Sequence, residues 1–414
     1  MLEGKIIKFY REYRNMKQKE LGDGICSSTH ISKIERGLTE VSRETIILLA
    51  ERLGIQLDEE VIQYKRVETL LLDWQETIIK KQQKKAEDIK QQLESIQLLH
   101  IPDFYRTYTL VLTRYYLFVS DVNQVEKLIE EMSFWTDLTK FEENMLLHIK
   151  GIYFGRVKSN FPMSLSYLKK IKLEHYANQE CYYDLALAYS FLNSSVLAFY
   201  NASKALEFFT KTRSFSRMID TEMLMLIQLE QSEDLPFLIS EYERLIDMTS
   251  DFGLDRQRTI LHHNLGYLHL QYGLFREAGN YYKKAMDARN PSDPQYLGSL
   301  EGYLNALTKE GNTSQSKLLN LLEEGLDIIN SSPDSIFYYL FTMHRYSILG
   351  EVERYYHYLE TEAFPYFEKM GYGLTIEYYA VKLFDYFMEK KELDKANQYA
   401  RHILRKIPRK NQFV

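Results

Sequence analysis

The chain has 414 residues, of which 45% are hydrophobic and 27% charged, and its formal net charge is −6. This acidic balance argues against a protein that coats nucleic acid indiscriminately, and two cysteines, Cys26 and Cys181, are too few for a disulfide framework. No apolar run reaches the roughly 18 residues of a membrane span, so we expect a cytoplasmic protein without a membrane partner.

The N-terminal segment is locally basic although the chain is acidic. Residues 1–19 contain six Lys or Arg side chains against two Glu. The apolar residues Ile6, Phe9 or Tyr10, and Tyr13 recur at helical spacing, which predicts a first helix over residues 4–15. A basic face on an acidic protein is typical of a site-specific DNA binder, because phosphate contacts gather in one place.

Residues 17–43, KQKELGDGICSSTHISKIERGLTEVSR, have the pattern of a helix-turn-helix. Gly24 can adopt the positive φ of the turn, and Ser27 or Ser28 can cap the second helix. Gly37 is expected to end that helix. The side chains on the outer face of this helix, near its N-terminal half, can then reach base edges. The predicted DNA-contacting residues are Gln18, Ser28, Thr29, Ser32, Lys33, Arg11, Arg14, Arg36 and Arg43.

Two more helices complete the predicted DNA-binding domain, which spans residues 1–66. Ser42 is expected to cap a fourth helix that Gly54 stops, and Asp58 to cap a fifth that ends near residue 66. Residues 67–101 are rich in Gln and Lys and predict one or two linker helices. They are either a connector or docking surface, or simply a charged, solvated helix. Pro102 marks the next boundary.

From residue 102 to 414 only helical patterns occur, in pairs with short polar turns. The clearest pair is HHNLGYLHLQYGLFREAGNYYKKAMDARNP, residues 262–291, which resembles the tetratricopeptide repeat. Two further copies align, one on Leu185, Ala186, Tyr189, Ala198, Ala202 and Ala205, and one on Leu383, Phe387, Ala396, Ala400 and Pro408. The predicted fold is therefore all-α, a helix-turn-helix followed by an α-solenoid. An irregular helical bundle is the alternative.

The first helix of each repeat should line a concave groove. Asn264 and Asn305 each offer a donor and an acceptor to a peptide backbone, although Asn264 could instead satisfy a helix end or a neighbouring turn. His263, Tyr267 and Gln271 lie on the same helix as Asn264. These residues are the predicted peptide-binding set.

Several motifs carry a family resemblance. Gln18, the ISKIERG run at 31–37 and Arg43 resemble the phage-repressor-like (XRE) helix-turn-helix over residues 4–66. With the repeats, the chain resembles the quorum-sensing receptors grouped with Rap, Rgg, NprR, PlcR and PrgX, nearest NprR and PlcR. The resemblance implies a cytosolic homodimer, or a higher oligomer, that binds a short signalling peptide and two DNA half-sites. It also suggests Arg114 for a peptide carboxylate.

No catalytic or metal-binding motif is present, so we expect neither an enzyme nor a cofactor. Two alternatives to the peptide-controlled regulator remain. In one, the chain is a Rap-like module that binds a response regulator and promotes its dephosphorylation. In the other, it is a repressor whose repeat domain senses a protein partner.

Overall fold

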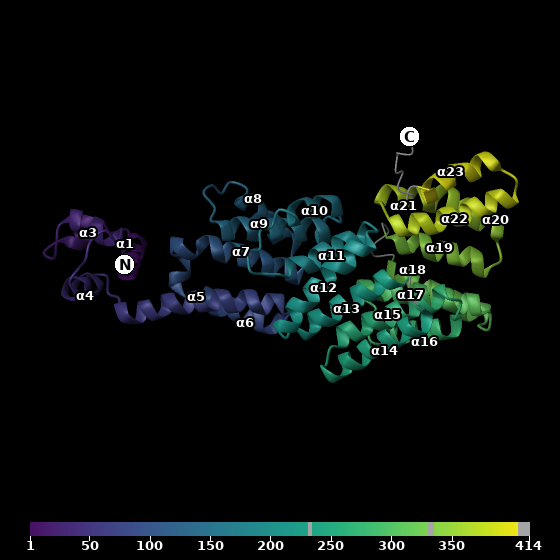
Figure 1. Cartoon of the computed structure of the whole chain (residues 1–414), viewed down its shortest axis with the longest axis horizontal. Coiled ribbons are helices and arrows are strands. Elements are labelled where there is room, and N and C mark those ends of the chain that lie inside the picture. Colours follow the sequence, from purple (N-terminus) through teal and green to yellow (C-terminus); the bar gives the residue numbers. More distant parts are fainter. Residues whose placement is uncertain (231–233, 330–334, 405–414) are drawn as a thin grey trace. The chain divides into compact units, whose positions relative to one another are not determined.

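The computed structural model describes residues 1–230, 234–329 and 335–404, and every regular element in these ranges is a helix (Figure 1). The prediction of an all-α chain is confirmed. None of the helices in the described ranges combines the length and apolarity needed to span a membrane. The chain divides after residue 233 into two compact units, which are described separately.

Unit 1 begins with the predicted helix-turn-helix. Its helices are α1 (Leu2–Tyr13), α2 (Gln18–Gly22), α3 (Ser28–Glu35) and α4 (Arg43–Arg52). The Ser27 hydroxyl accepts a hydrogen bond from the His30 amide at 3.2 Å and caps α3, and Ser42 caps α4 in the same way. Gly24 has φ +71°, as the turn requires. These local predictions hold because capping and turn residues act within a few positions of themselves.

The fifth helix differs from the prediction in length and in its cap. Helix α5 runs from Leu57 to Ile79 without interruption, with Gln56 at its N-cap and Asp58 inside its first turn. The predicted boundary at residue 66 therefore lies inside a helix. No Gly or Pro occurs in α5, so nothing in the sequence stops it there.

The predicted linker is part of the packed array. Helix α6 (Gln83–Glu94) lies beside α5 (Figure 1) and buries Ala86, Ile89 and Leu93. In α5, Trp74 is completely buried, with its ring 5.9 Å from that of Tyr108 on α7 (Pro102–Val119). The alternative of a merely solvated helix is wrong, because one face of each helix joins the core.

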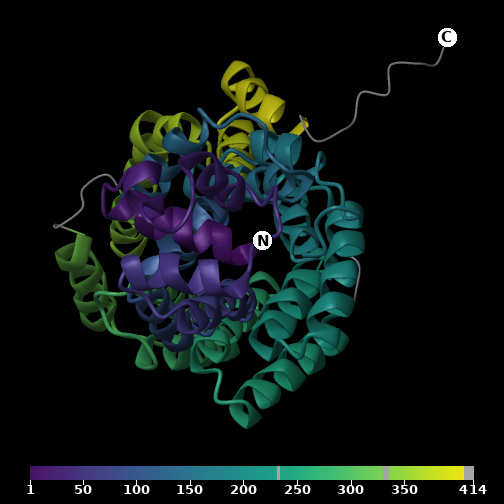
Figure 2. The ribbon, with the colours of Figure 1, turned by 90° about the vertical axis from the view of Figure 1, so that its left-hand side faces the viewer.

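The rest of unit 1 consists of successive helical pairs. Helices α11, α12 and α13, teal in Figure 2, lie side by side in chain order. Helix α7 begins at Pro102, the position at which the sequence predicts a boundary. The bounds are η1 (Gln97–His100), α7 (Pro102–Val119), α8 (Val122–Met132), α9 (Lys140–Ile152), η2 (Tyr153–Val157), α10 (Phe161–Leu168), α11 (Cys181–Phe191), α12 (Ser195–Lys211) and α13 (Phe215–Leu229).

Unit 2 continues with the same kind of pairs. Helices α15, α17 and α19 contact one another in sequence as first members of successive pairs. The bounds are α14 (Leu235–Asp251), α15 (Asp255–Gln271), α16 (Phe275–Asp287), α17 (Pro294–Glu310), α18 (Gln315–Ile329), α19 (Ile336–Ile348), α20 (Val352–Tyr358), η3 (Leu359–Ala363), α21 (Phe364–Met370), α22 (Gly373–Glu389) and α23 (Leu393–Leu404).

The clearest predicted repeat is the α15–α16 pair. The Tyr282 ring on α16 is 2% exposed and lies between Gly266 of α15 and Gly302 of α17. A Cβ on Gly302 would come within 2.3 Å of that ring. Small residues thus let the helices approach while one aromatic ring fills the gap.

The two weaker repeat copies also form helical pairs. In α11 and α12, Ala186, Ala198, Ala202 and Ala205 are completely buried. In α22 and α23, Leu383 and Ala396 are completely buried, whereas Pro408 lies outside the described residues.

Candidate functional site

The exposed side of α3 is the candidate DNA-binding surface. Ser28, Thr29 and Lys33 are exposed on it, and Ser32 is half-buried. Arg36 is also exposed, and its Nε donates to the Ser32 carbonyl at 3.1 Å. These polar side chains therefore lie along the outer face of a capped helix, with Ser28 and Thr29 in its first turn, as a helix that reads a DNA groove requires.

The remaining predicted DNA contacts fall into two classes. Arg14 and Arg43 are exposed at the surface, and Arg43 makes only a 3.7 Å ion pair with the exposed Asp58. Arg11 instead donates from Nε to the buried carboxylate of Glu35 at 2.5 Å, and its side chain is 11% exposed. Gln18 donates to the other oxygen of Glu35 at 2.8 Å.

The assignment of Arg11 to DNA contact is therefore corrected. Glu35 is the last residue of α3, Arg11 lies on α1 and Gln18 on α2, so one carboxylate ties three helices together. Burial of a charge requires such partners. Arg11 holds α1 against α3 rather than offering a free guanidinium, and Gln18 bonds the same carboxylate from α2.

The predicted peptide-binding residues of α15 lie on one stripe. Asn264, Tyr267 and Gln271 are spaced three and four residues apart, and Tyr267 and Gln271 are exposed. The Asn264 amide is half-buried and forms no hydrogen bond with another residue in the described ranges. His263 points instead toward α17, with Nδ1 at 3.1 Å from the Ser299 hydroxyl.

Asn305 lines a cavity of about 290 Å³ inside unit 2. Its amide also has no hydrogen-bond partner among the described residues. Side chains of α17, α19, α20 and α22 form the walls, and most of the larger ones are tyrosines and lysines. The lining includes Asn305, Thr308, Lys309, Leu340, Met343, His344, Ser347, Val352, Tyr355, Tyr356, Tyr378, Tyr379 and Lys382.

Lys382 is the most unusual group in this cavity. Its Nζ donates to the Tyr355 hydroxyl at 3.4 Å and lies 5.0 Å from the centre of the Tyr378 ring. Burial lowers the pKa of this ammonium group, against the opposing field of Glu301. Glu301 is hydrogen-bonded to His344 at 2.7 Å, and no carboxylate of the described residues forms an ion pair with Lys382.

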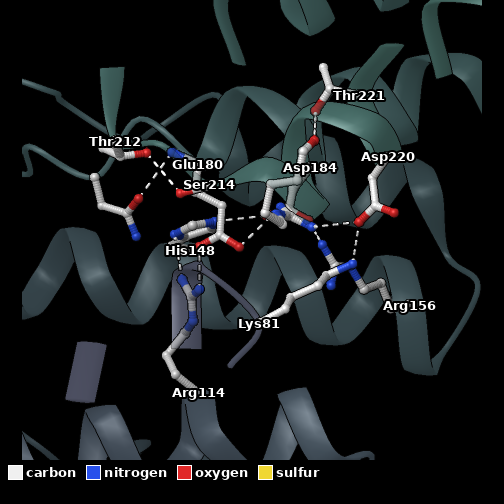
Figure 3. Close-up of polar contacts among 12 residues, drawn as sticks. Lys81, Arg114, His148, Arg156, Glu180, Asp184, Thr212, Ser214, Asp220 and Thr221 are labelled. Carbon is white, nitrogen blue, oxygen red and sulfur yellow. Dashed lines mark hydrogen bonds and ion pairs between the residues drawn. The ribbon is translucent and has the colours of Figure 1, made fainter. Parts of the chain in front are cut away.

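Arg114, the residue suggested for a peptide carboxylate, belongs to a buried network in unit 1 (Figure 3). Its guanidinium forms an ion pair with Glu180 and donates to Nδ1 of His148 at 3.0 Å. The side chain is 6% exposed. We therefore assign Arg114 to this internal network instead of to a ligand.

The network joins segments that are far apart in the sequence. His148 Nε2 donates to Asp184 at 2.9 Å, and Arg156 donates to the other oxygen of Asp184 at 2.5 Å. Lys81, in the turn after α5, donates to Asp220 of α13 at 2.5 Å. These contacts hold the α5–α6 turn against the repeat helices.

The protonation states in this network follow from its contacts. Burial alone would raise the pKa of Glu180, but Arg114 and Arg217 outweigh it and lower that pKa to about 2. Burial and then Arg114 lower the pKa of His148, which stays neutral with its proton on Nε2. No group of three or more His, Cys, Asp or Glu side chains in the described ranges is placed to hold a metal ion.

Comparisons with known proteins bear on both units. Residues 7–59 match the helix-turn-helix family. The chain is 25% identical over 409 residues to the transcriptional activator NprA of Geobacillus stearothermophilus, covering 92% of this chain and 97% of NprA. It is 21% identical over 368 residues to response regulator aspartate phosphatase I of Bacillus subtilis strain 168, covering 84% and 92%.

Solved structures show the same fold. The apo form of the quorum sensor NprR from B. thuringiensis matches with a TM-score of 0.67 at 21% identity, covering 82% of this chain and 98% of NprR. NprR in complex with its cognate peptide NprX matches with a TM-score of 0.64, at the same identity and coverage. The predicted resemblance is confirmed.

Sequence reasoning missed the groups that need long-range partners. Glu35 was overlooked because nothing local to it indicates a buried carboxylate. The chain has 33 tyrosines, a residue that suits half-buried aromatic surfaces, but their number does not indicate which of them meet Lys382.

Proposed function

We propose that this chain is a transcriptional regulator whose sequence-specific DNA binding is controlled by a short signalling peptide bound to its repeat helices. The observation that carries the proposal is the single helix α5. Its N-terminal half belongs to the DNA-binding domain, since Tyr10 of α1 donates to Glu60 at 2.7 Å. Its C-terminal half buries Trp74 against the repeat helix α7.

The full-length similarity to a transcriptional activator supports DNA binding as the output. The fold of NprR, one structure of which contains a peptide, supports a peptide as the input. Helix α5 is shared by the DNA-binding domain and the repeat helices, so it can couple the two. A shift of the repeat helices would move a continuous element of the DNA-binding domain.

The DNA site is expected to consist of two half-sites bound by a homodimer. One small helix-turn-helix contacts only a few base pairs, so a symmetric pair supplies the rest of the sequence specificity. Sedimentation of the chain on a duplex with one or two half-sites would measure this stoichiometry.

The test is a fluorescence anisotropy titration of the full chain on a labelled duplex from upstream of its own gene. Synthetic peptides that tile the C-termini of small secreted reading frames beside the gene are added in turn. One peptide should change the DNA affinity, and Asn264→Ala should remove that response while leaving DNA binding intact. Asn320→Ala, at an exposed position of α18, is the matched control. If no peptide changes the DNA affinity, the proposal that a peptide controls this chain is wrong.

A second candidate function is suggested by the similarity to a response regulator aspartate phosphatase. In that case the chain would bind a response regulator and promote loss of its phosphate. Thr29→Ala with Lys33→Ala separates the two functions in the full chain, because DNA binding should be lost while binding of a response regulator should survive.

A further inference from the structure

The wall of the cavity in unit 2 carries one charged side chain with few partners, Lys382. An ammonium group carries three donors, and the one described acceptor of Lys382 Nζ is the Tyr355 hydroxyl at 3.4 Å. A charge removed from water is costly unless it is paired. The charge is partly compensated by the faces of Tyr355, Tyr378 and Tyr379, whose ring centres lie 5.0–5.8 Å away.

The walls of the cavity are held in place independently of any ligand. Tyr356 stacks on Tyr386 with ring centres 3.8 Å apart and an interplanar angle of 10°. Tyr378 and Tyr379 meet edge to face at 4.9 Å. Such contacts fix the orientation of the rings, so the cavity does not need a ligand to form.

The size and chemistry of the cavity limit its occupant. About 290 Å³ lies at the lower end of the range of small-molecule pockets and suits one residue rather than a whole peptide. Tyrosine faces favour an aromatic or branched apolar side chain, and the unpaired ammonium favours a carboxylate. Asn305 can bond the amide next to that carboxylate, since its own amide is free of protein partners in the described ranges.

We propose that this cavity binds the C-terminal residue of the signalling peptide, with the free α-carboxylate on Lys382 and an apolar side chain among the tyrosines. The inference rests on the proposed function for the source of the ligand. The recognition chemistry itself, an apolar group that carries a carboxylate, does not depend on it.

The first experiment tests the cavity without any peptide. N-acetyl-L-phenylalanine and its uncharged C-terminal amide are titrated into the full chain and followed by saturation-transfer NMR. The acid should bind at least tenfold more tightly than the amide, as expected for a charge-assisted contact. Lys382→Met should remove that difference. Lys317→Met, at an exposed site on α18, should retain it.

Three results would overturn the inference. They are equal binding of acid and amide to the wild type, no binding of either at millimolar concentration, and a preference for the acid that persists in Lys382→Met.

A second arm separates this inference from the proposed function. A peptide that alters DNA affinity is compared with its C-terminally amidated form. Weaker binding of the amidated form to the wild type but not to Lys382→Met supports the assignment. Equal effects of both forms would refute it while the peptide-controlled function stands. In a third outcome, the cavity binds the acid but no peptide changes the DNA affinity of the chain. That outcome would mean that the ligand is a free small carboxylate, and it would contradict a peptide as the source.

Discussion

Two arginines three positions apart, Arg11 in α1 and Arg14 at its C-cap, have opposite surroundings. Arg11 is held by the buried carboxylate of Glu35, whereas Arg14 is exposed. Both contribute to the basic face seen in the sequence, but only an exposed guanidinium can exchange counterions with DNA phosphates.

Replacing Arg11 should therefore affect stability rather than the electrostatics of binding. We expect Arg11→Ala to lower the free energy of unfolding by about 1.5–3 kcal/mol, because Glu35 loses a charged hydrogen-bond donor. The salt dependence of DNA affinity, measured well below the unfolding transition, should stay as in the wild type. A shallower salt dependence would return Arg11 to the DNA-contacting set.

Arg14→Ala is the matched change. It should weaken binding to all duplexes alike and flatten the plot of affinity against salt concentration, with little effect on thermal stability. Anisotropy titrations at several salt concentrations measure this. A loss confined to one sequence would mean that Arg14 reads a base.

Lys33 is an exposed cation on α3, the helix proposed to contact DNA. Lys33→Ala should cost about 1–3 kcal/mol of binding free energy for the cognate sequence and much less for a scrambled duplex. Competition between the two duplexes gives the ratio directly. An unchanged sequence preference would exclude Lys33 from direct readout.

At the scale of elements, helix packing in unit 2 depends on where glycines meet aromatic rings. Gly302 on α17 and Gly279 on α16 are both helical, but a Cβ on Gly302 would lie 2.3 Å from the Tyr282 ring, whereas one on Gly279 meets no atom closer than 3.8 Å. The Tyr282 ring is buried and has little room to move.

These two glycines make a controlled pair for mutation. Gly302→Ala should destabilise the chain by about 1–3 kcal/mol through overpacking. Gly279→Ala should be neutral or slightly stabilising, because alanine favours helix without a clash. Urea unfolding followed by circular dichroism compares the two. Equal effects would show that the α15–α17 packing is looser than the structure has it.

At the scale of the whole molecule, the buried charges of unit 1 connect α5 with helices up to α13. Because the pKa values of His148 and Glu180 are lowered in the folded state, both groups make the free energy of unfolding fall as the pH falls. Folded His148 has a pKa below that of the unfolded state, so its contribution is full above the unfolded value near 6.5 and falls as pH drops below it. Glu180 contributes above its unfolded pKa, and this is lost as pH falls toward about 2.

We therefore expect the urea midpoint of unit 1 to fall steadily from pH 7 to pH 3. Tryptophan fluorescence reports unit 1 selectively, because both tryptophans, Trp74 and Trp135, lie there. Glu180→Gln should be less stable than the wild type at pH 7, by about 3–5 kcal/mol, since Arg114 and Arg217 lose their carboxylate. Its further loss between pH 5 and pH 3 should be smaller. A midpoint independent of pH would contradict the ionisation states assigned here.

Several features of this protein depend only on residues that are near neighbours in the chain. The cap at Ser27 and the turn at Gly24 act within one or two turns of helix, so their outcome can be predicted from the residues alone. Gly266 and Ala278 act between two helices that follow each other in the chain, and their spacing matches a known repeat, so this pair can be predicted as well. The exposed polar half of α3 follows from the same periodicity.

Which polar side chains are free depends instead on contacts between distant parts of the chain. Arg11 finds Glu35 24 residues away and Arg114 finds Glu180 66 residues away, so neither pairing has a local signal. The cavity around Lys382 draws on four helices between residues 305 and 382. Burying a charged side chain without a partner raises the free energy of the folded state, whereas an exposed charge is stabilised by water. The role of a charged side chain therefore depends on which distant residues folding brings next to it.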